Sequence, residues 1–482
     1  MQSLSSRVPL TAPRYLEITG FKSIRRTTRV RIANLTLLAG ANSSGKSAFI
    51  QPLLLLKQTL ESHFDPGPLL LSGAHVQFTS PRELLSRGGR RSDDAREFSI
   101  VLGPTKFTSP RWMLHCRRAA RHDTPATKIT FRAKNLRQPE KGFNTPLVSI
   151  LGSNRWIDFH NSMNCRDYCD AVRCYCALDL EKCLPAFKGA TVNVTYDRFL
   201  PSARLRLSLE NRRRREFGYA AVASPLMPVA SYVPWLLSLL HLPGLRGHRD
   251  RLYPVSGVEA RVGQRVLAQG PFTPYAASVL DQWSRYRSDG EERLERVNAW
   301  LHQLGLAREV RAVRVNAAQV KLEVTRLPAR RRGRVSDFVD LADVGFGVSQ
   351  VLPVVVALVA ATAGQAVYIE QPELHLHPQA QSRLGAIICE AAAGGAVVIV
   401  ETHSQLLLRA IQTAVAKGVL DPGMVSLNWF GREARSGITK VREADVDGDG
   451  TLGEWPADFA EVEARADETW LDAMARARRK GV

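Results

Sequence analysis

Residues 35–47 read Leu-Thr-Leu-Leu-Ala-Gly-Ala-Asn-Ser-Ser-Gly-Lys-Ser and carry the most specific signal of the fold in the 482-residue chain. Residues 35–39 are apolar enough for a buried strand, and residues 47–60 carry apolar side chains at helical spacing. The turn between them fits the pattern G-x4-G-K-[ST], which needs a strand before it and a helix after it. The sequence therefore predicts a strand, a phosphate-binding loop and a helix.

The small residues of this loop let consecutive backbone N–H groups close around the α- and β-phosphates at the helix N-terminus. We expect Lys46 to reach the β- and γ-phosphates and Ser47 to ligate Mg²⁺. The predicted nucleotide contacts are Gly40, Asn42, Ser43, Ser44, Gly45, Lys46 and Ser47. ATP and Mg²⁺ are the expected cofactors.

Two later apolar segments each end in residues suited to phosphate chemistry. Residues 366–369 predict a strand that ends at Glu370, a Walker B acid expected to hold Mg²⁺ together with Ser47. Residues 396–400 predict a second strand, which delivers His403 to the same edge of the sheet as a γ-phosphate sensor. The expected catalytic residues are Glu370, Gln371, Glu373 and His403.

Helices predicted over residues 348–361 and 378–392 alternate with these strands, which indicates an α/β fold with a largely parallel sheet. Between about residues 65 and 330 the pattern loosens into short strands, Arg-rich connectors and a few helices, among them 276–286 and 291–304. We interpret this middle part as an insertion. It carries no sustained heptad pattern, so a long coiled-coil arm is not expected.

Several motifs together resemble the ABC-type P-loop ATPases of the chromosome-maintenance, RecF and overcoming-lysogenization-defect group. Within that group, the chain is most similar to bacterial AAA-type ATPases with a C-terminal domain of unknown function. The matching stretches are residues 18–23, 40–47, 70–73, 242–246, 343–350, 370–378, 401–403 and 453–456. They span nearly the whole chain.

The resemblance implies an α/β ABC-type ATPase head with an inserted α+β lobe and a small C-terminal unit. We divide the chain into an N-terminal head part (1–100), the inserted lobe (101–335), a C-terminal head part (336–421) and a small C-terminal domain with a basic helix (422–482).

The resemblance also implies an ATP-gated homodimer. Such proteins hold two ATPs between two heads, and the signature loop of one head completes the phosphate site of the other. Gly345, Gly347, Ser349 and Gln350 match this loop. Glycines permit close backbone approach, and the following helix N-terminus offers donors to a phosphate.

One departure from the family pattern concerns hydrolysis. ABC ATPases commonly have Glu directly after the Walker B acid, as the base for the attacking water, but this chain has Gln371. Glutamine can orient water but cannot take its proton. We expect slow hydrolysis; reliance on Glu373, or loss of turnover, are the alternatives.

The charge balance points to a nucleic-acid partner. The chain has 66 Lys and Arg against 46 Asp and Glu, a net charge of +20. Basic runs at residues 212–215, 330–334 and 476–480 are candidate phosphate contacts. With only 7% aromatic residues, the composition favours salt-sensitive binding to duplex DNA over base stacking on single strands.

The sequence shows no secretory signal and no apolar run long enough for a membrane span, so we expect a cytoplasmic protein without a membrane partner. Five cysteines crowd between Cys165 and Cys183, with spacings that match a zinc site only in part. Residues 445–450 begin like a calcium loop, but Pro456 stands where a bidentate Glu is needed.

These observations predict an ATPase that dimerises on ATP and acts as a nucleic-acid-linked switch or sensor, in antiviral defence or genome maintenance. The alternative is an ATP-binding scaffold with little turnover, which holds and regulates a separately encoded nuclease or toxin effector. A transporter subunit fits the long insertion poorly.

Overall fold

The structure is a computed structural model. It describes residues 12–88, 94–106, 123–134, 142–151, 155–159, 191–208, 219–224, 228–246, 250–255, 266–285, 289–325, 337–455, 468–471 and 474. The basic runs at 212–215, 330–334 and 476–480, the cysteines from Cys165 to Cys183 and most of the predicted basic helix 465–480 lie outside these residues.

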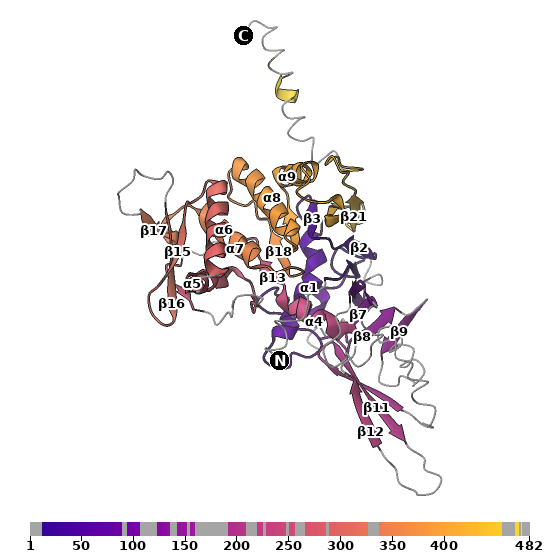
Figure 1. Cartoon of the computed structure of the whole chain (residues 1–482). Coiled ribbons are helices and arrows are strands. Elements are labelled where there is room, and N and C mark those ends of the chain that lie inside the picture. The colour runs from indigo at the N-terminus through magenta and orange to yellow at the C-terminus, as the bar shows by residue number, and fades with distance from the viewer. Residues whose placement is uncertain are drawn as a thin grey trace.

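A six-stranded sheet forms the centre of the described structure (Figure 1). Its order is β13 (Leu240–Leu242), β18 (Ala366–Glu370), β19 (Val397–Thr402), β3 (Leu35–Gly40), β20 (Val425–Arg432) and β21 (Thr439–Ala444). Neighbouring strands from β13 to β20 run parallel, and β21 pairs antiparallel with β20. Strand β3 therefore lies inside the sheet, and its carboxyl end meets those of β18 and β19.

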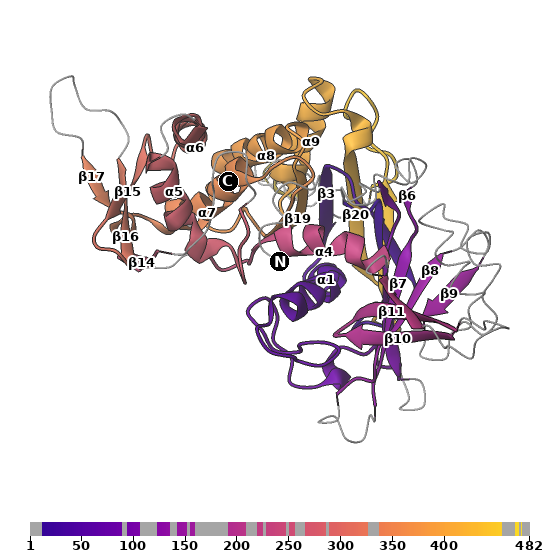
Figure 2. The same cartoon turned by 60° about the horizontal axis from the view of Figure 1, so that its bottom comes forward.

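Both faces of the central sheet are covered, which explains why its strands are apolar almost throughout. On β3, Leu37 packs into one hydrophobic core and Leu38 into the other; Val400 and Ile399 divide in the same way on β19. The first core contains α7 (Phe346–Ala360), α8 (Pro378–Ala393) and α9 (Gln405–Ala416). The second contains α1 (Lys46–Glu61) and α4 (Pro228–Ser238), on the opposite face (Figure 2).

An antiparallel sheet closes the second core. Its order is β2 (Thr28–Arg31), β1 (Tyr15–Thr19), β4 (Glu97–Leu102), β7 (Thr127–Arg132), β8 (Leu147–Leu151) and β9 (Trp156–Phe159). Strands β5 (Thr105–Lys106) and β6 (Asp123–Thr124) pair separately, and β10 (Thr191–Asp197), β11 (Leu200–Ser208) and β12 (Tyr219–Ser224) form a three-stranded sheet that projects from the molecule (Figure 1).

The predicted inserted lobe, residues 101–335, is not a single body. Its β7, β8 and β9 extend the N-terminal sheet, and its β13 is the outer strand of the central sheet. Helices α5 (Ala276–Arg285) and α6 (Asp289–Leu304) belong to the same core as α7 and α8. Beside them lie β14 (Tyr253–Pro254), β15 (Val310–Arg314), β16 (Gln319–Thr325) and β17 (Phe338–Asp340).

The prediction of a separate unit over residues 422–482 was wrong for its first part, because β20 and β21 complete the central sheet. β20 is an inner strand of the sheet, but its polar residues hide this in the sequence pattern, because inner strands are usually apolar. Ser426 and Asn428 are fully buried, and the Asn428 side chain donates to Ser426 Oγ (3.0 Å) and to Leu37 O (3.4 Å). Hydrogen bonding of this kind lets polar residues occupy an inner strand.

No helix among the described residues is long and apolar enough to cross a membrane.

If β20 is integral to the ATPase sheet, substituting its buried Phe430 destabilises the whole head. Phe430 is fully buried, and its ring packs edge-on against Phe49 of α1 at 5.7 Å. We expect F430A to lower the free energy of unfolding in urea by about 3–5 kcal/mol. F64A, at a side chain that is 64% exposed, is the control and should leave it unchanged. Equal, small effects would contradict the integral strand.

Candidate nucleotide-binding site

The loop between β3 and α1 adopts a conformation that needs glycine at both ends. Gly40 has φ 149° and Gly45 φ 108°. A Cβ on Gly40 would lie 2.1 Å from Phe430 O, and one on Gly45 would lie 2.3 Å from Thr439 Oγ1. The β20–β21 hairpin is therefore in direct contact with the loop, and Thr439 Oγ1 donates to Ser44 O at 2.8 Å.

The N-terminus of α1 is open to an anion. Its N-cap, Gly45, provides no side-chain acceptor, and its first turn has no acidic residue. The first backbone N–H groups of a helix have no partner within the helix, and the helix dipole favours negative charge beside them. The local structure is therefore suited to phosphate.

A cleft of about 360 Å³ opens in front of this helix terminus. It is lined by Lys22, Ser23, Asn42, Ser43, Ser44, Gly45, Lys46, Ser47, Ala48, Gln51, Gln371, Glu401, His403 and Arg432. The structure thus brings Gln371 and His403 together with the predicted loop residues from Asn42 to Ser47. Glu401 and Arg432 were not among the predicted site residues.

Lys46 lies across the loop. Its Nζ donates to Gly40 O at 3.0 Å and to Ala41 O at 2.9 Å, and the residue is only 3% exposed. Burial lowers the pKa of Lys46, and the nearby charges of Glu401 and Glu373 oppose this. The ammonium group is therefore already positioned at the phosphate side of the loop.

Ser47, the predicted metal ligand, is paired with Glu401. Its Oγ donates to Glu401 Oε1 at 2.8 Å, and Tyr368 OH donates to Glu401 Oε2 at 3.0 Å. Burial raises the pKa of Glu401, as does the charge of Glu370, against the hydrogen bond from Ser47 and the charge of Lys46. Glu401 is an acidic residue at the end of an apolar segment, as Glu370 is, and this is the sequence signal that could have identified it; in the structure the two residues stand in register.

The predicted Walker B residue, Glu370, reaches the same edge but has other partners. Its Oε1 lies 3.0 Å from His241 Nε2, and its Oε2 accepts from Gly244 N at 3.1 Å. Burial raises the pKa of Glu370, but the His241 hydrogen bond, Gly244 N–H and nearby positive charge outweigh it and leave the pKa lowered. The structure therefore pairs Ser47 with Glu401 and holds Glu370 on the β13 side.

Gln371 and Glu373 have different surroundings: Gln371 lines the cleft, and Glu373 does not. Gln371 has φ 43°, which is unusual for a residue with a side chain, and its backbone N–H donates to Glu401 O at 2.7 Å. Glu373 is buried, and its Oε1 accepts from Thr402 Oγ1 and from His403 N, both at 2.8 Å. The suggestion that Glu373 serves as the base is not supported, because it braces the loop that carries His403 and does not line the cleft.

His403, the predicted γ-phosphate sensor, lines the cleft. Burial lowers the pKa of its ring, and so does the charge of Lys46, whereas a hydrogen bond to the Gly40 backbone opposes both.

The predicted signature loop begins α7. Gly345 is its exposed N-cap, and Ser349 Oγ donates to Phe346 O at 3.1 Å. Gln350, predicted as a nucleotide contact, instead points inward: it is 3% exposed and its Oε1 accepts from Arg246 N at 3.0 Å. As far as the structure describes the chain, none of residues 345–350 lines the cleft of its own head.

Arg246 was not among the predicted site residues, yet it connects this loop to the cleft. The residue is 1% exposed, and burial lowers the pKa of its guanidinium to about 10. Its donors reach Pro243 O (2.7 Å), Glu370 O (2.5 Å), Gln371 O (3.1 Å) and Gln350 O (3.2 Å). One side chain therefore binds the start of α7 to the backbone on which Gln371 stands.

Among the described residues, no group of three or more His, Cys, Asp or Glu side chains is arranged to hold a metal ion. In the loop that resembles a calcium site, Asp449 Oδ1 accepts from Thr451 N at 2.8 Å.

We expect R246K to lower the free energy of unfolding by about 2 kcal/mol or more, because an ammonium group cannot reproduce the fork of donors that Arg246 presents to four carbonyl groups. Urea denaturation measures the effect. R251K is the matched control, since Arg251 is 64% exposed and pairs with Asp343 at the surface. A loss no larger than that of R251K would contradict the role assigned to Arg246.

Part of the chain is similar to a known protein family. Residues 278–409 match the model of a family described as "AAA domain, putative AbiEii toxin, Type IV TA system". No curated protein matches the chain.

Solved structures similar to the chain include three Smc head domains. They are the SMC head domain from Thermotoga maritima (11% identity, 90% of this chain and 99% of that one, TM-score 0.38); an SmcHead bound to the C-winged helix domain of ScpA (12%, 91% and 98%, 0.45); and an Smc head domain with an extended coiled coil, bound to the C-terminal domain of ScpA derived from Pyrococcus furiosus (11%, 90% and 97%, 0.40). Likenesses of this strength carry no information on function. Residues 278–409 are thus similar to an AAA-domain family, and the P-loop motif of the chain is built into a parallel sheet.

Proposed function

We propose that the chain binds ATP and Mg²⁺ in the cleft in front of α1 and hydrolyses ATP slowly, and that two ATP-bound copies join as a nucleic-acid-linked switch. The observation that carries the proposal is the cleft itself, in which an open helix N-terminus, Lys46 and the Ser47–Glu401 pair face one space. Backbone N–H groups and Lys46 would bind the phosphates.

The residues at the sheet edge fit a magnesium ion. Mg²⁺ prefers hard oxygen ligands, and the hydroxyl of Ser47 contacts the carboxylate of Glu401, whose partner in register on the neighbouring strand is Glu370. When bound, the ion would neutralise charge on the β- and γ-phosphates. Ser47 and Glu370 remain the proposed ligands, and Glu401 is added to them.

Slow turnover follows from the residue at the usual position of the base. Gln371 lines the cleft but cannot accept a proton from water. The carboxylate of Glu401 also lines the cleft, but it is already engaged by Ser47 and Tyr368. The cleft can therefore orient water well and activate it poorly.

The placement of the signature loop supports a homodimer. Gly345 is exposed, Phe346 is 44% exposed, and both stand at the N-terminus of α7, outside the cleft of their own head. This helix terminus could offer its donors to a phosphate bound by a second copy. The proposed contacts with the second copy's nucleotide are Gly345, Gly347 and Ser349. Gln350 is not a contact of this kind, because its side chain is buried and accepts a hydrogen bond from Arg246 N.

Duplex DNA is the proposed partner because of the net charge of +20. A role in antiviral defence or genome maintenance rests on the family resemblance. The second candidate function, favoured by Gln371, is an ATP-binding scaffold that turns over little ATP and holds a separately encoded effector.

We expect the purified chain to release phosphate from ATP in the presence of Mg²⁺. The rate should rise when duplex DNA is added, and this stimulation should fall steeply between about 50 and 200 mM salt. K46A should lower the rate of ATP turnover by about a hundredfold or more, because it removes the charge that stabilises the phosphates. K417A, at an exposed lysine after α9, is the control. Turnover that ignores DNA would favour the scaffold.

Restoring the usual acid at position 371 should accelerate hydrolysis. If the missing base limits turnover, Q371E raises kcat by about a hundredfold, the lower end of general-base catalysis. Single-turnover phosphate release measures this step directly. Should Q371E leave kcat unchanged while nucleotide still binds, the proton acceptor is not what makes this ATPase slow.

A further inference from the structure

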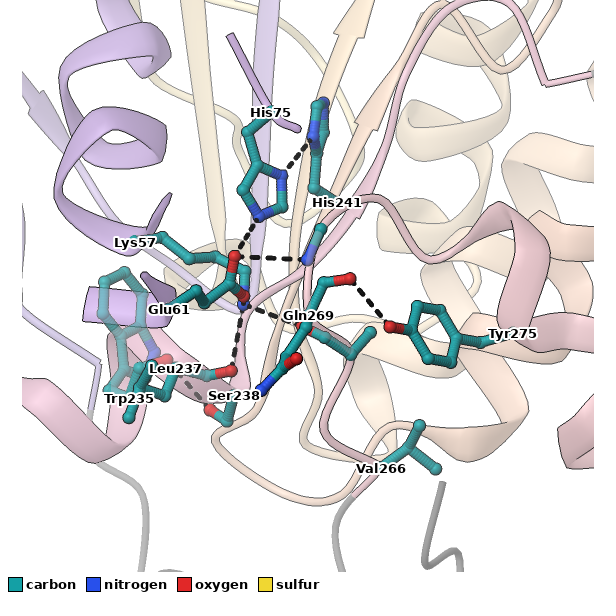
Figure 3. Close-up of polar contacts among 12 residues, drawn as sticks. Lys57, Glu61, His75, Trp235, Leu237, Ser238, His241, Val266, Gln269 and Tyr275 are labelled. Atoms are coloured by element: carbon teal, nitrogen blue, oxygen red, sulfur yellow. Dashed lines mark hydrogen bonds and ion pairs between the residues drawn. The ribbon is translucent and has the colours of Figure 1, made fainter. Parts of the chain in front are cut away.

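Four buried polar side chains form a continuous path that starts at the C-terminal end of α1 and reaches His241 in Figure 3, and His241 in turn contacts Glu370. They are Lys57, Glu61, His75 and His241, which we call the buried relay. Lys57 Nζ lies 2.6 Å from Glu61 Oε1; Glu61 Oε2 lies 3.0 Å from His75 Nε2; the Nδ1 atoms of the two histidines are 3.0 Å apart; and His241 Nε2 lies 3.0 Å from Glu370 Oε1.

The buried relay is almost closed to solvent. The side chains of Lys57, Glu61, His75 and His241 are 1%, 10%, 0% and 2% exposed. Lys57 Nζ also donates to Leu237 O and Ala268 O, at 3.0 and 3.2 Å. Apolar residues of similar shape are often as stable or more stable than buried charges, so stability alone is a weak reason for such a set. Buried ionisable groups that lead to a reactive site are candidates for a functional role.

The buried relay links the C-terminal end of α1 to Glu370 at the edge of the central sheet. Helix α1 carries Lys46 and Ser47 at its start and Lys57 and Glu61 in its last turns. Through the two histidines, the far end of the same helix holds the carboxylate that stands in register with Glu401. Gly244 N and His241 Nε2 each contact one oxygen of the Glu370 carboxylate, so His241 contributes to the orientation of that group.

We propose that His241 is a positioning residue for Glu370 and that the buried relay sets how tightly the cleft holds Mg²⁺ with nucleotide. The inference rests on the proposed function and deepens it. His241 does not line the cleft; it acts by holding the proposed metal ligand Glu370, as residues behind metal ligands commonly do.

Two substitutions at position 241 separate its two hydrogen bonds. An Asn side chain places its amide where His Nδ1 lies and keeps the contact with His75, whereas Gln reaches the place of Nε2 and keeps the contact with Glu370. We expect H241N to raise the Mg²⁺ concentration for half-maximal binding of a fluorescent non-hydrolysable ATP analogue about tenfold or more, and H241Q to stay within about threefold of the wild type.

Nucleotide binding without Mg²⁺ should be the same in the wild type, H241N and H241Q, which a merely structural defect would not leave intact. H75L should shift the Mg²⁺ dependence in the same direction by a smaller factor of about three, because it acts through His241. Y275F is the matched control, since Tyr275 OH donates to Gln269 O beside the buried relay without joining it (Figure 3). Thermal melting checks that each variant is folded.

Equal shifts in H241N and H241Q, or no shift in either, would overturn the positioning role while leaving the proposed function in place. If the wild type binds the analogue no better than K46A, the proposed function itself fails, and this inference fails with it.

Discussion

The parallel register of β18, β19 and β3 is the constraint on which the rest of the molecule depends. It sets Glu370 opposite Glu401, and Thr402 opposite Ala39 at the start of the loop. Because carboxyl ends of parallel strands meet at one edge, three segments separated by hundreds of residues deliver the loop, the acids and His403 to a single cleft. A shift of one residue would turn each of these side chains to the other face.

Around this edge the protein buries more polar groups than a simple core would need. Arg246 serves carbonyls on three segments, Glu373 braces the backbone of His403, and the buried relay supports Glu370 from behind. Each group is expensive to bury alone and acceptable only with its partners, so these contacts restrict the backbone to one arrangement. The left-handed conformation of Gln371 persists because both of its backbone polar groups are held, by Glu401 O and by Arg246.

The two faces of the central sheet carry different parts of the proposed site. One core joins the central strands to α7, α8 and α9, so the signature loop is anchored to the rigid part of the head. The other joins them to α1 and the antiparallel sheet, so the phosphate-binding helix is packed on a different layer. Arg246 and the buried relay are polar links between these layers and the strand ends. A movement of one layer relative to the other would therefore change the contacts of Glu370.

The sequence by itself determined the local order of the fold. Apolar segments of strand length, helical periodicity and the glycines of the loop predicted α1, α7 and α8 to within two residues, because these features depend on near neighbours. It also identified Asn42 to Ser47, Gln371 and His403, which the structure gathers in one cleft. Only the tertiary structure decided that Ser47 faces Glu401, that Gln350 turns inward to Arg246 and that β20 lies within the sheet. These outcomes depend on strand order and on partners more than 100 residues away in the chain, for which local patterns carry no signal.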